Sequence, residues 1–286
     1  MKNLIQKFIN LILYSNCWIA LCAVAMVLQT ELIFLGHLQW SNYAAFVFTA
    51  TLFVYALHRV VGLEKVAAFQ EKGRFLVISN FKSHIAIYAG LSGLACLYFF
   101  IKMAWWAQVA LVVPGVLSLG YVLPIFGKKR RLRDFNFIKI FLIAIVWSWV
   151  TVLIPATYCG QIFSTGLLIM TIERALFIFA LTLPFDIRDL KVDQHTGVKT
   201  IPAALGKKNA KLLAFSSLAL TLILVQINIS SGFYANISLL PFIISALISS
   251  IFIYFADDTR HDYFYTAGVD GMMIVQFVLV YLFCFN

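Results

Sequence analysis

The chain has 286 residues, of which 62% are hydrophobic and only 12% are charged, and its formal net charge is +10. So large an apolar fraction excludes an ordinary soluble domain. Because the Lys and Arg residues lie between apolar segments, the positive charge indicates membrane topology and not nucleic-acid binding.

Nine segments are apolar and about 20 residues long, the length that a helix needs to cross a bilayer. The first follows Lys2 and Lys7 without a convincing cleavage site, so we expect a retained helix and not a signal peptide. The pattern predicts an all-α integral membrane protein with nine transmembrane helices. The predicted spans are 14–36, 40–58, 83–101, 103–124, 137–158, 162–184, 209–228, 236–255 and 266–285.

The connections between these spans alternate between short neutral loops and longer charged ones. If the N-terminus is cytoplasmic, every Lys and Arg except Lys102 and Arg174 lies on the cytoplasmic side or at its edge. The positive-inside rule therefore predicts a cytoplasmic N-terminus and a C-terminus on the opposite side. We expect a multi-pass protein of a bacterial inner membrane.

The cysteines are odd in number, and their spacing fits no metal motif. Most lie within apolar runs, which predicts buried free thiols and neither a disulfide nor a zinc site. They are Cys17, Cys22, Cys96, Cys159 and Cys284.

Basic and aromatic residues follow the second and fourth spans. His58 and Arg59 end the second span, where an arginine often extends its side chain to the membrane surface. Tyr121 ends the fourth span, and a basic run from Lys128 to Arg133 follows it. We expect one or two residues of this run to reach an anionic ligand, and the others to set topology near anionic lipid.

The sixth span contains Glu173 and Arg174 near its middle. Ionisable residues at that depth are costly and usually face a cavity or a partner. Because adjacent helical residues point in different directions, these two need not pair with each other.

The most acidic stretch of the chain follows the sixth span and reads Asp186-x-x-Asp189-x-x-x-Asp193. On a helix these positions share one face, where like charges repel unless a cation lies between them. Oxygen ligands favour a hard ion such as Mg²⁺. With Arg188 and Lys199 nearby, this pattern predicts a Mg²⁺ site for a diphosphate group; the alternative is a solvated loop.

This motif, its position after the sixth of nine spans, and the downstream segments 197–202 and 205–206 resemble the UbiA-type intramembrane prenyltransferase superfamily. Tyr121-x-x-Pro124 with the basic run is a second resemblance. The resemblance implies a single domain over 1–286, with its helices bundled around a central cavity. It also implies Mg²⁺-dependent transfer of a prenyl group from a polyprenyl diphosphate to an aromatic or other lipophilic acceptor, in contact with membrane lipid.

The resemblance gives each candidate residue a role. The Mg²⁺ ligands and catalytic residues would be Asp186, Asp189 and Asp193. The residues that contact substrate would be His58, Arg59, Tyr121, Lys128, Arg131, Arg188 and Lys199.

The chain departs from the family at the first aspartate-rich motif, N-x-x-x-D-x-x-x-D. Tyr55, Arg59 and Leu63 occupy the three positions, and Glu64 is the nearest carboxylate. Either Arg59 binds diphosphate oxygens in place of one metal, or catalysis is lost and the chain binds isoprenoid lipid or assists another membrane enzyme. A transporter is a third class, but Pro114 and Pro155 do not form the paired helix breaks typical of one.

Overall fold

The computed structural model describes residues 13, 15–62, 82–127, 130–235 and 237–285. Within these ranges the regular structure is helical, apart from one isolated bridge between Phe126 and Arg130. The predicted all-α class is therefore confirmed. The helices are α2 (Cys17–Leu35), α3 (Asn42–Gly62), α5 (Lys82–Lys102), α6 (Trp105–Ala110), α7 (Val112–Val122), the 3-10 turn η3 (Leu132–Asp134), α8 (Ile138–Ser148), the π-helix η4 (Trp149–Leu153), α9 (Ile154–Tyr158), α10 (Thr165–Arg188), α11 (Leu190–His195), α12 (Ile201–Ser230), α13 (Leu240–Phe255), the π-helix η5 (Phe264–Val269) and α14 (Asp270–Cys284).

In the described part of the chain, eight helical segments are long and apolar enough to cross a membrane. The predicted span at 236–255 corresponds to α13, which has 16 residues, so the count of nine full spans is not confirmed. Many large apolar side chains lie on the outside of the bundle, among them Trp105, Ile162 and Leu247. Such a surface is compatible with lipid and not with water. The chain is a multi-pass integral membrane protein.

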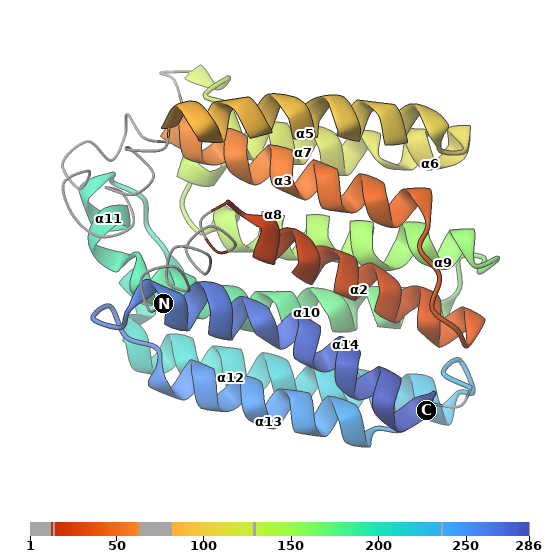
Figure 1. The fold of residues 1–286 in the computed structure, drawn as a ribbon. Coiled ribbons are helices and arrows are strands. Elements are labelled where there is room, and N and C mark those ends of the chain that lie inside the picture. Colours follow the sequence, from red (N-terminus) through yellow and green to blue (C-terminus); the bar gives the residue numbers. More distant parts are fainter. Residues whose placement is uncertain (1–12, 14, 63–81, 128–129, 236, 286) are drawn as a thin grey trace, which may run out of the picture.

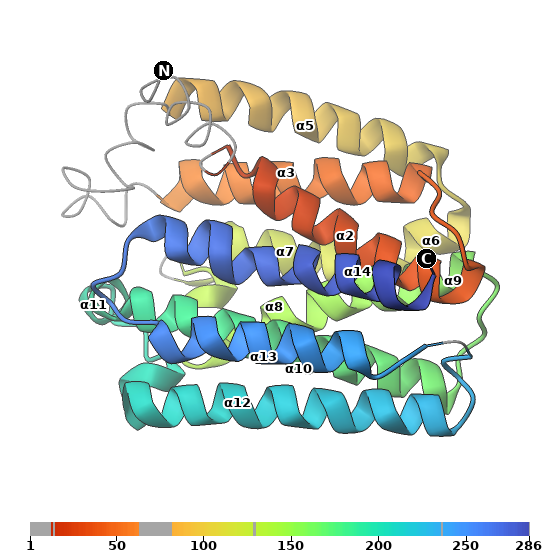
Figure 2. The same ribbon diagram turned by 60° about the horizontal axis from the view of Figure 1, so that its bottom comes forward.

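The helices run roughly along one axis, with α3 and α5 on one side of the bundle and α12 and α13 on the other (Figures 1 and 2). Helix α2 packs against α3 and α14, and α10 packs against α8 and α12. The short helix α11 lies at one end of the bundle, beyond the end of α10 (Figure 1). We refer to this end as the α11 end.

Two helical segments depart from regular geometry where their sequence favours it. The π-helix η4 precedes Pro155, which has no backbone N–H for a regular helical bond. Gly206 interrupts α12 with φ of 81°, a conformation in which glycine is the least strained residue.

Helix α10 ends at Arg188, and Asp189 separates it from α11. Asp186 therefore lies on α10, Asp193 on α11 and Asp189 between them, so the motif does not occupy one continuous helix.

A buried polar network lies near the middle of α10. The Tyr234 hydroxyl donates a hydrogen bond of 2.8 Å to Glu173 Oε2, and Arg174 Nη1 donates one of 3.0 Å to the Met26 carbonyl. The two adjacent charges thus have separate partners, as their positions on the helix predict. Because Glu173 and Arg174 are both 2% exposed, each partner is needed to satisfy a charge away from water.

Replacing Tyr234 by phenylalanine is expected to lower the free energy of unfolding by about 1–3 kcal/mol, because Glu173 then keeps a buried oxygen without a donor. Thermal unfolding in detergent measures the change. Tyr254→Phe is the matched control, since that ring is 65% exposed. Equal melting temperatures for the two variants would contradict the role of the hydrogen bond.

Candidate active site

A cavity of about 870 Å³ opens among α2, α3, α5, α7, α8, α10 and α14. Most of its wall is apolar, with side chains such as Phe46, Leu94 and Val146. Its charged side chains gather where α3 and α10 end and where the α7–α8 connection passes, which is the α11 end of the bundle. An apolar chamber with one charged end can hold a lipid chain and its anionic head group at the same time.

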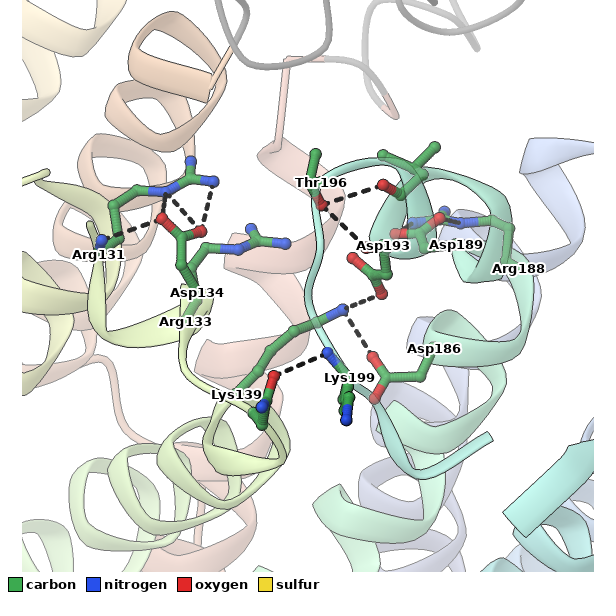
Figure 3. A network of polar contacts seen from close by, with 12 residues as sticks. Arg131, Arg133, Asp134, Lys139, Asp186, Arg188, Asp189, Asp193, Thr196 and Lys199 are labelled. Carbon is green, nitrogen blue, oxygen red and sulfur yellow. Dashed lines mark hydrogen bonds and ion pairs between the residues drawn. The ribbon is translucent and has the colours of Figure 1, made fainter. Parts of the chain in front are cut away.

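Lys139 lies between two carboxylates of the acidic motif (Figure 3). Its Nζ is 2.7 Å from Asp186 Oδ1 and 3.2 Å from Asp193 Oδ2. All three side chains are at most 8% exposed. Helix α8 carries the lysine, while α10 and α11 carry the two aspartates, so packing of three helices forms this ion cluster.

The third motif carboxylate has a different cation. Arg188 Nε donates to Asp189 Oδ1 at 2.8 Å, and Arg188 Nη1 donates to Asp262 Oδ1 at 2.9 Å. The guanidinium also lies 4.8 Å from the ring centre of Phe185 and 5.3 Å from that of Tyr265, within the range of cation–π attraction. Arg188 therefore links the end of α10 to the helical turn that precedes η5.

Arg133 extends from the α7–α8 connection toward the acidic motif (Figure 3). Its Nη1 contacts His58 Nε2, and its guanidinium lies 5.1 Å above the Tyr121 ring. Among the residues that the structure describes, no carboxylate lies within ion-pair distance of Arg133. Its donors can therefore turn to an anionic ligand in the cavity.

The remaining predicted residues are divided between the cavity and the surface. Arg59 and Arg131 line the cavity, and Arg131 holds Asp134 through contacts of 2.9–3.3 Å. Lys199 is exposed and outside the cavity wall, and its backbone N–H donates to Asn136 Oδ1. Lys128, with Leu63 and Glu64 of the altered first motif, lies outside the described residues.

At this end of the cavity, burial and neighbouring charges shift pKa values in opposite directions. Burial raises the pKa of Asp193 above its usual value, although the charge of Lys139 opposes the shift. Burial acts to lower the pKa of Arg133, but Tyr121 and the nearby carboxylates, Asp193 first among them, raise it overall. Arg133 is thus a permanent positive charge, and the site gathers cations around a group of buried carboxylates.

In the described ranges, no group of three or more His, Cys, Asp or Glu side chains is placed to hold one metal ion. Asp186 and Asp193 nevertheless offer oxygen ligands that suit Mg²⁺. The Asp186 Oδ1 atom accepts no hydrogen bond of good geometry, despite its 2.7 Å ion pair with Lys139. The donor set fits one Mg²⁺ if the Lys139 ammonium moves aside and ligand oxygens complete the coordination.

The sequence motifs predicted neither Lys139 nor Asp262 as a site residue. A signal for Lys139 existed, because it is a lone charge inside a predicted span and such a charge needs a partner. Of the acidic cluster at 257–262, only Asp262 lines the cavity. Asp257 and Asp258 pair with Lys207, and Asp258 also pairs with Lys191.

Comparisons with known proteins agree on one family. The model of the UbiA prenyltransferase family matches residues 72–267. The fold is similar to a UbiA homologue from Archaeoglobus fulgidus bound to GPP and Mg²⁺, with a TM-score of 0.60 and 11% identity over 95% of this chain and 96% of that one. It is also similar to a digeranylgeranylglyceryl phosphate synthase, with a TM-score of 0.59 and 13% identity over 100% and 99% of the two chains. No curated protein matches the sequence.

Proposed function

Because this chain belongs to the UbiA prenyltransferase family, we propose that it transfers a prenyl group from a polyprenyl diphosphate to an aromatic or other lipophilic acceptor. The observation that carries the proposal is the cavity, which is apolar along most of its wall and charged at one end. The apolar part suits a prenyl chain, and the charged end suits its diphosphate. Structures similar to this chain hold GPP or DMAPP together with Mg²⁺.

At the charged end, some residues would hold the metal ion that binds the diphosphate, and others would balance the carboxylate charge. Asp186 and Asp193 would hold Mg²⁺, with Asp189 kept close by Arg188. When bound, the ion neutralises diphosphate oxygens and makes the group a better leaving group. Arg188 and Lys139 then balance the remaining carboxylate charge, while the apolar walls exclude the water that would capture an allylic cation.

Cationic side chains take the place of the altered first aspartate motif in this proposal. Arg59, His58 and Arg133 line the same cavity as the acidic motif. A guanidinium binds two phosphate oxygens in a planar arrangement, so Arg133 and Arg59 supply charge that a second metal would otherwise supply. The altered motif points to Arg59 for this role, and the contacts of Arg133 with His58 and Tyr121 favour Arg133 as its partner.

We also propose that the α11 end faces the cytoplasm. The described parts of the charged loops lie at this end, and the positive-inside rule assigns such loops to the cytoplasmic side. A water-soluble diphosphate head group would then enter the charged end from the cytoplasm, while the prenyl chain enters the cavity from the bilayer.

The test is diphosphate release from geranyl diphosphate by the purified protein in lipid nanodiscs, with and without MgCl₂. We expect release that needs Mg²⁺ and falls by about 10²–10³-fold in Asp186→Asn, because the variant loses a metal ligand of the leaving group. Asp258→Asn, which removes a carboxylate outside the cavity, is the control with unchanged release. Release by the wild type without Mg²⁺, or its full retention in Asp186→Asn, contradicts the proposal.

The second candidate function is binding of an isoprenoid lipid without catalysis. Two observations favour it: Lys139 lies where a metal would bind the acidic motif, and the first motif has lost its carboxylates. Binding of geranyl diphosphate with no release under any metal condition would support this function.

A further inference from the structure

A basic depression lies on the outer surface of the bundle, where the start of α12 meets the end of α13. The two helices pack side by side at one edge of the bundle (Figure 2). The depression has a volume of about 450 Å³ and is lined by Lys207, Lys208, Lys211 and Tyr254. None of these four residues lines the central cavity. We refer to this separate feature as the α12–α13 depression.

The lysines of the depression differ in how their charge is balanced. Lys207 Nζ pairs with Asp257 Oδ2 at 2.9 Å and also with Asp258. Lys208 is exposed, and no carboxylate of the described residues lies within ion-pair distance of Lys208 or Lys211. In the part of the chain that the structure describes, these two ammonium groups therefore carry charge without a counterion.

Neutral groups hold the cations at the end of α13. Lys211 Nζ donates to the Tyr254 carbonyl oxygen at 2.7 Å, and Arg260 Nε donates to the Phe255 carbonyl oxygen at 3.2 Å. The Arg260 guanidinium also lies 5.7 Å from the ring centre of Phe255. These contacts fix the positions of both cations without cancelling their charge. An ammonium has three N–H donors and a guanidinium has five, so both keep donors for an anion.

The α12–α13 depression lies at the level of the lipid head groups. Residues 212–230 of α12 contain no charged side chain and rise about 28 Å along the helix, close to the thickness of the hydrocarbon core of a bilayer. The three lysines directly precede this segment. Lys191 of α11 pairs with Asp258, which also pairs with Lys207, so the depression belongs to the α11 end of the bundle.

Toward the middle of the membrane, the surface beside the depression is apolar. Leu212 lies one turn beyond Lys208 on α12 and is exposed. On α13, the exposed residues Tyr254, Ile251 and Leu247 share one face of the helix. Acyl chains cover such a surface in an integral membrane protein. Cations at head-group level thus lie next to apolar side chains at acyl-chain level.

From this arrangement we infer that the α12–α13 depression binds the phosphate of an anionic phospholipid, whose acyl chains lie along α12 and α13. Basic pockets between transmembrane helices bind such head groups in other proteins. The unbalanced charges of Lys208 and Lys211 favour a lipid with a net negative charge, because the choline group of a zwitterionic lipid would lie close to cations. The inference does not depend on the proposed prenyl transfer.

The test is native mass spectrometry of the protein in a non-ionic detergent, with dioleoylphosphatidylglycerol or dioleoylphosphatidylcholine added at equal concentration. We expect phosphatidylglycerol to bind its tightest site at least about 10-fold more strongly. Lys208→Gln and Lys211→Gln should each weaken that binding about 5-fold, and the double variant about 25-fold, because each basic residue near a membrane surface contributes about this factor. Lys102→Gln removes the same charge at the other end of the bundle and is the control with unchanged affinity.

Equal affinities for the two lipids, or unchanged phosphatidylglycerol binding in the double variant, overturn the inference. Lys208 is exposed and has no hydrogen bond or ion pair among the described residues, so its variant keeps the test decisive even if Lys211→Gln fails to fold.

Potassium phosphate separates a lipid site from a site for soluble anions. At the concentration of the lipid, it should leave bound phosphatidylglycerol in place, because it lacks the acyl chains that cover Leu212 and Ile251. Displacement of the lipid by phosphate alone would assign the depression to a soluble anion and overturn the inference. Absence of diphosphate release by the wild type would contradict the proposed prenyl transfer and would leave this test unaffected.

Discussion

Replacing Lys139 by methionine is expected to lower the free energy of unfolding by about 3–5 kcal/mol, because breaking a buried ion cluster leaves uncompensated charge. Asp186 and Asp193 would remain with side chains that are 3% and 7% exposed and without their cation. Methionine has a similar length and an apolar stem, so the change removes the charge with little loss of volume. The midpoint of thermal unfolding in detergent measures the effect.

Mg²⁺ should partly reverse this loss, because the two carboxylates are then free to bind a cation and a ligand of the folded state stabilises it. Millimolar MgCl₂ should raise the unfolding midpoint of Lys139→Met and change that of the wild type much less. Lys191→Met is the matched control, since its side chain is 73% exposed and pairs with Asp258, outside the cavity. A variant that melts like the wild type, with or without Mg²⁺, would show that this cluster does not stabilise the fold.

Replacing Arg133 by methionine is expected to reduce kcat/KM for geranyl diphosphate by about 10²–10³-fold, as loss of one preorganised donor to the reacting group does elsewhere. The guanidinium contacts His58 and lies over Tyr121, and no described carboxylate pairs with it, so its donors are available to the diphosphate. The prediction depends on the proposed prenyl transfer. Steady-state kinetics with a fixed acceptor concentration measure it.

Arg133→Lys should recover only part of the activity, because an ammonium keeps the charge and loses the planar pair of donors. Arg260→Met is the control: that arginine lies outside the cavity wall and donates to the Phe255 carbonyl. An unchanged kcat/KM in Arg133→Met would exclude Arg133 as a diphosphate contact. The role of the missing metal would then fall to Arg59.

The acidic motif shows what the spacing of residues in a sequence can predict and what it cannot. The positions of Asp186, Asp189 and Asp193 predicted a polar site after the sixth span, and Asp186, Asp189 and Asp193 do line the cavity. The same spacing suited one continuous helix, whereas the break at Asp189 divides the motif between α10 and α11. Local periodicity describes a continuous helix, but it does not reveal where the chain turns to satisfy tertiary contacts.

The sequence by itself determined the helical class, the approximate position of each apolar helix and the family. Hydropathy is a local property, and a bilayer leaves few alternatives to the helix for an apolar segment. The short α13, with 16 residues, shows the limit of that argument, since the apolar run predicted a longer span.

Only the tertiary structure decided which charges meet. Lys139 and Asp193 are 54 positions apart, and Arg188 and Asp262 are 74 apart, yet each pair is in contact. A buried charge requires a partner, but the identity of that partner depends on which helices pack together. For the same reason the sequence does not reveal that Trp18 and Asp270, which lie near opposite ends of the chain, line one cavity: they share its wall because α2 packs against α14.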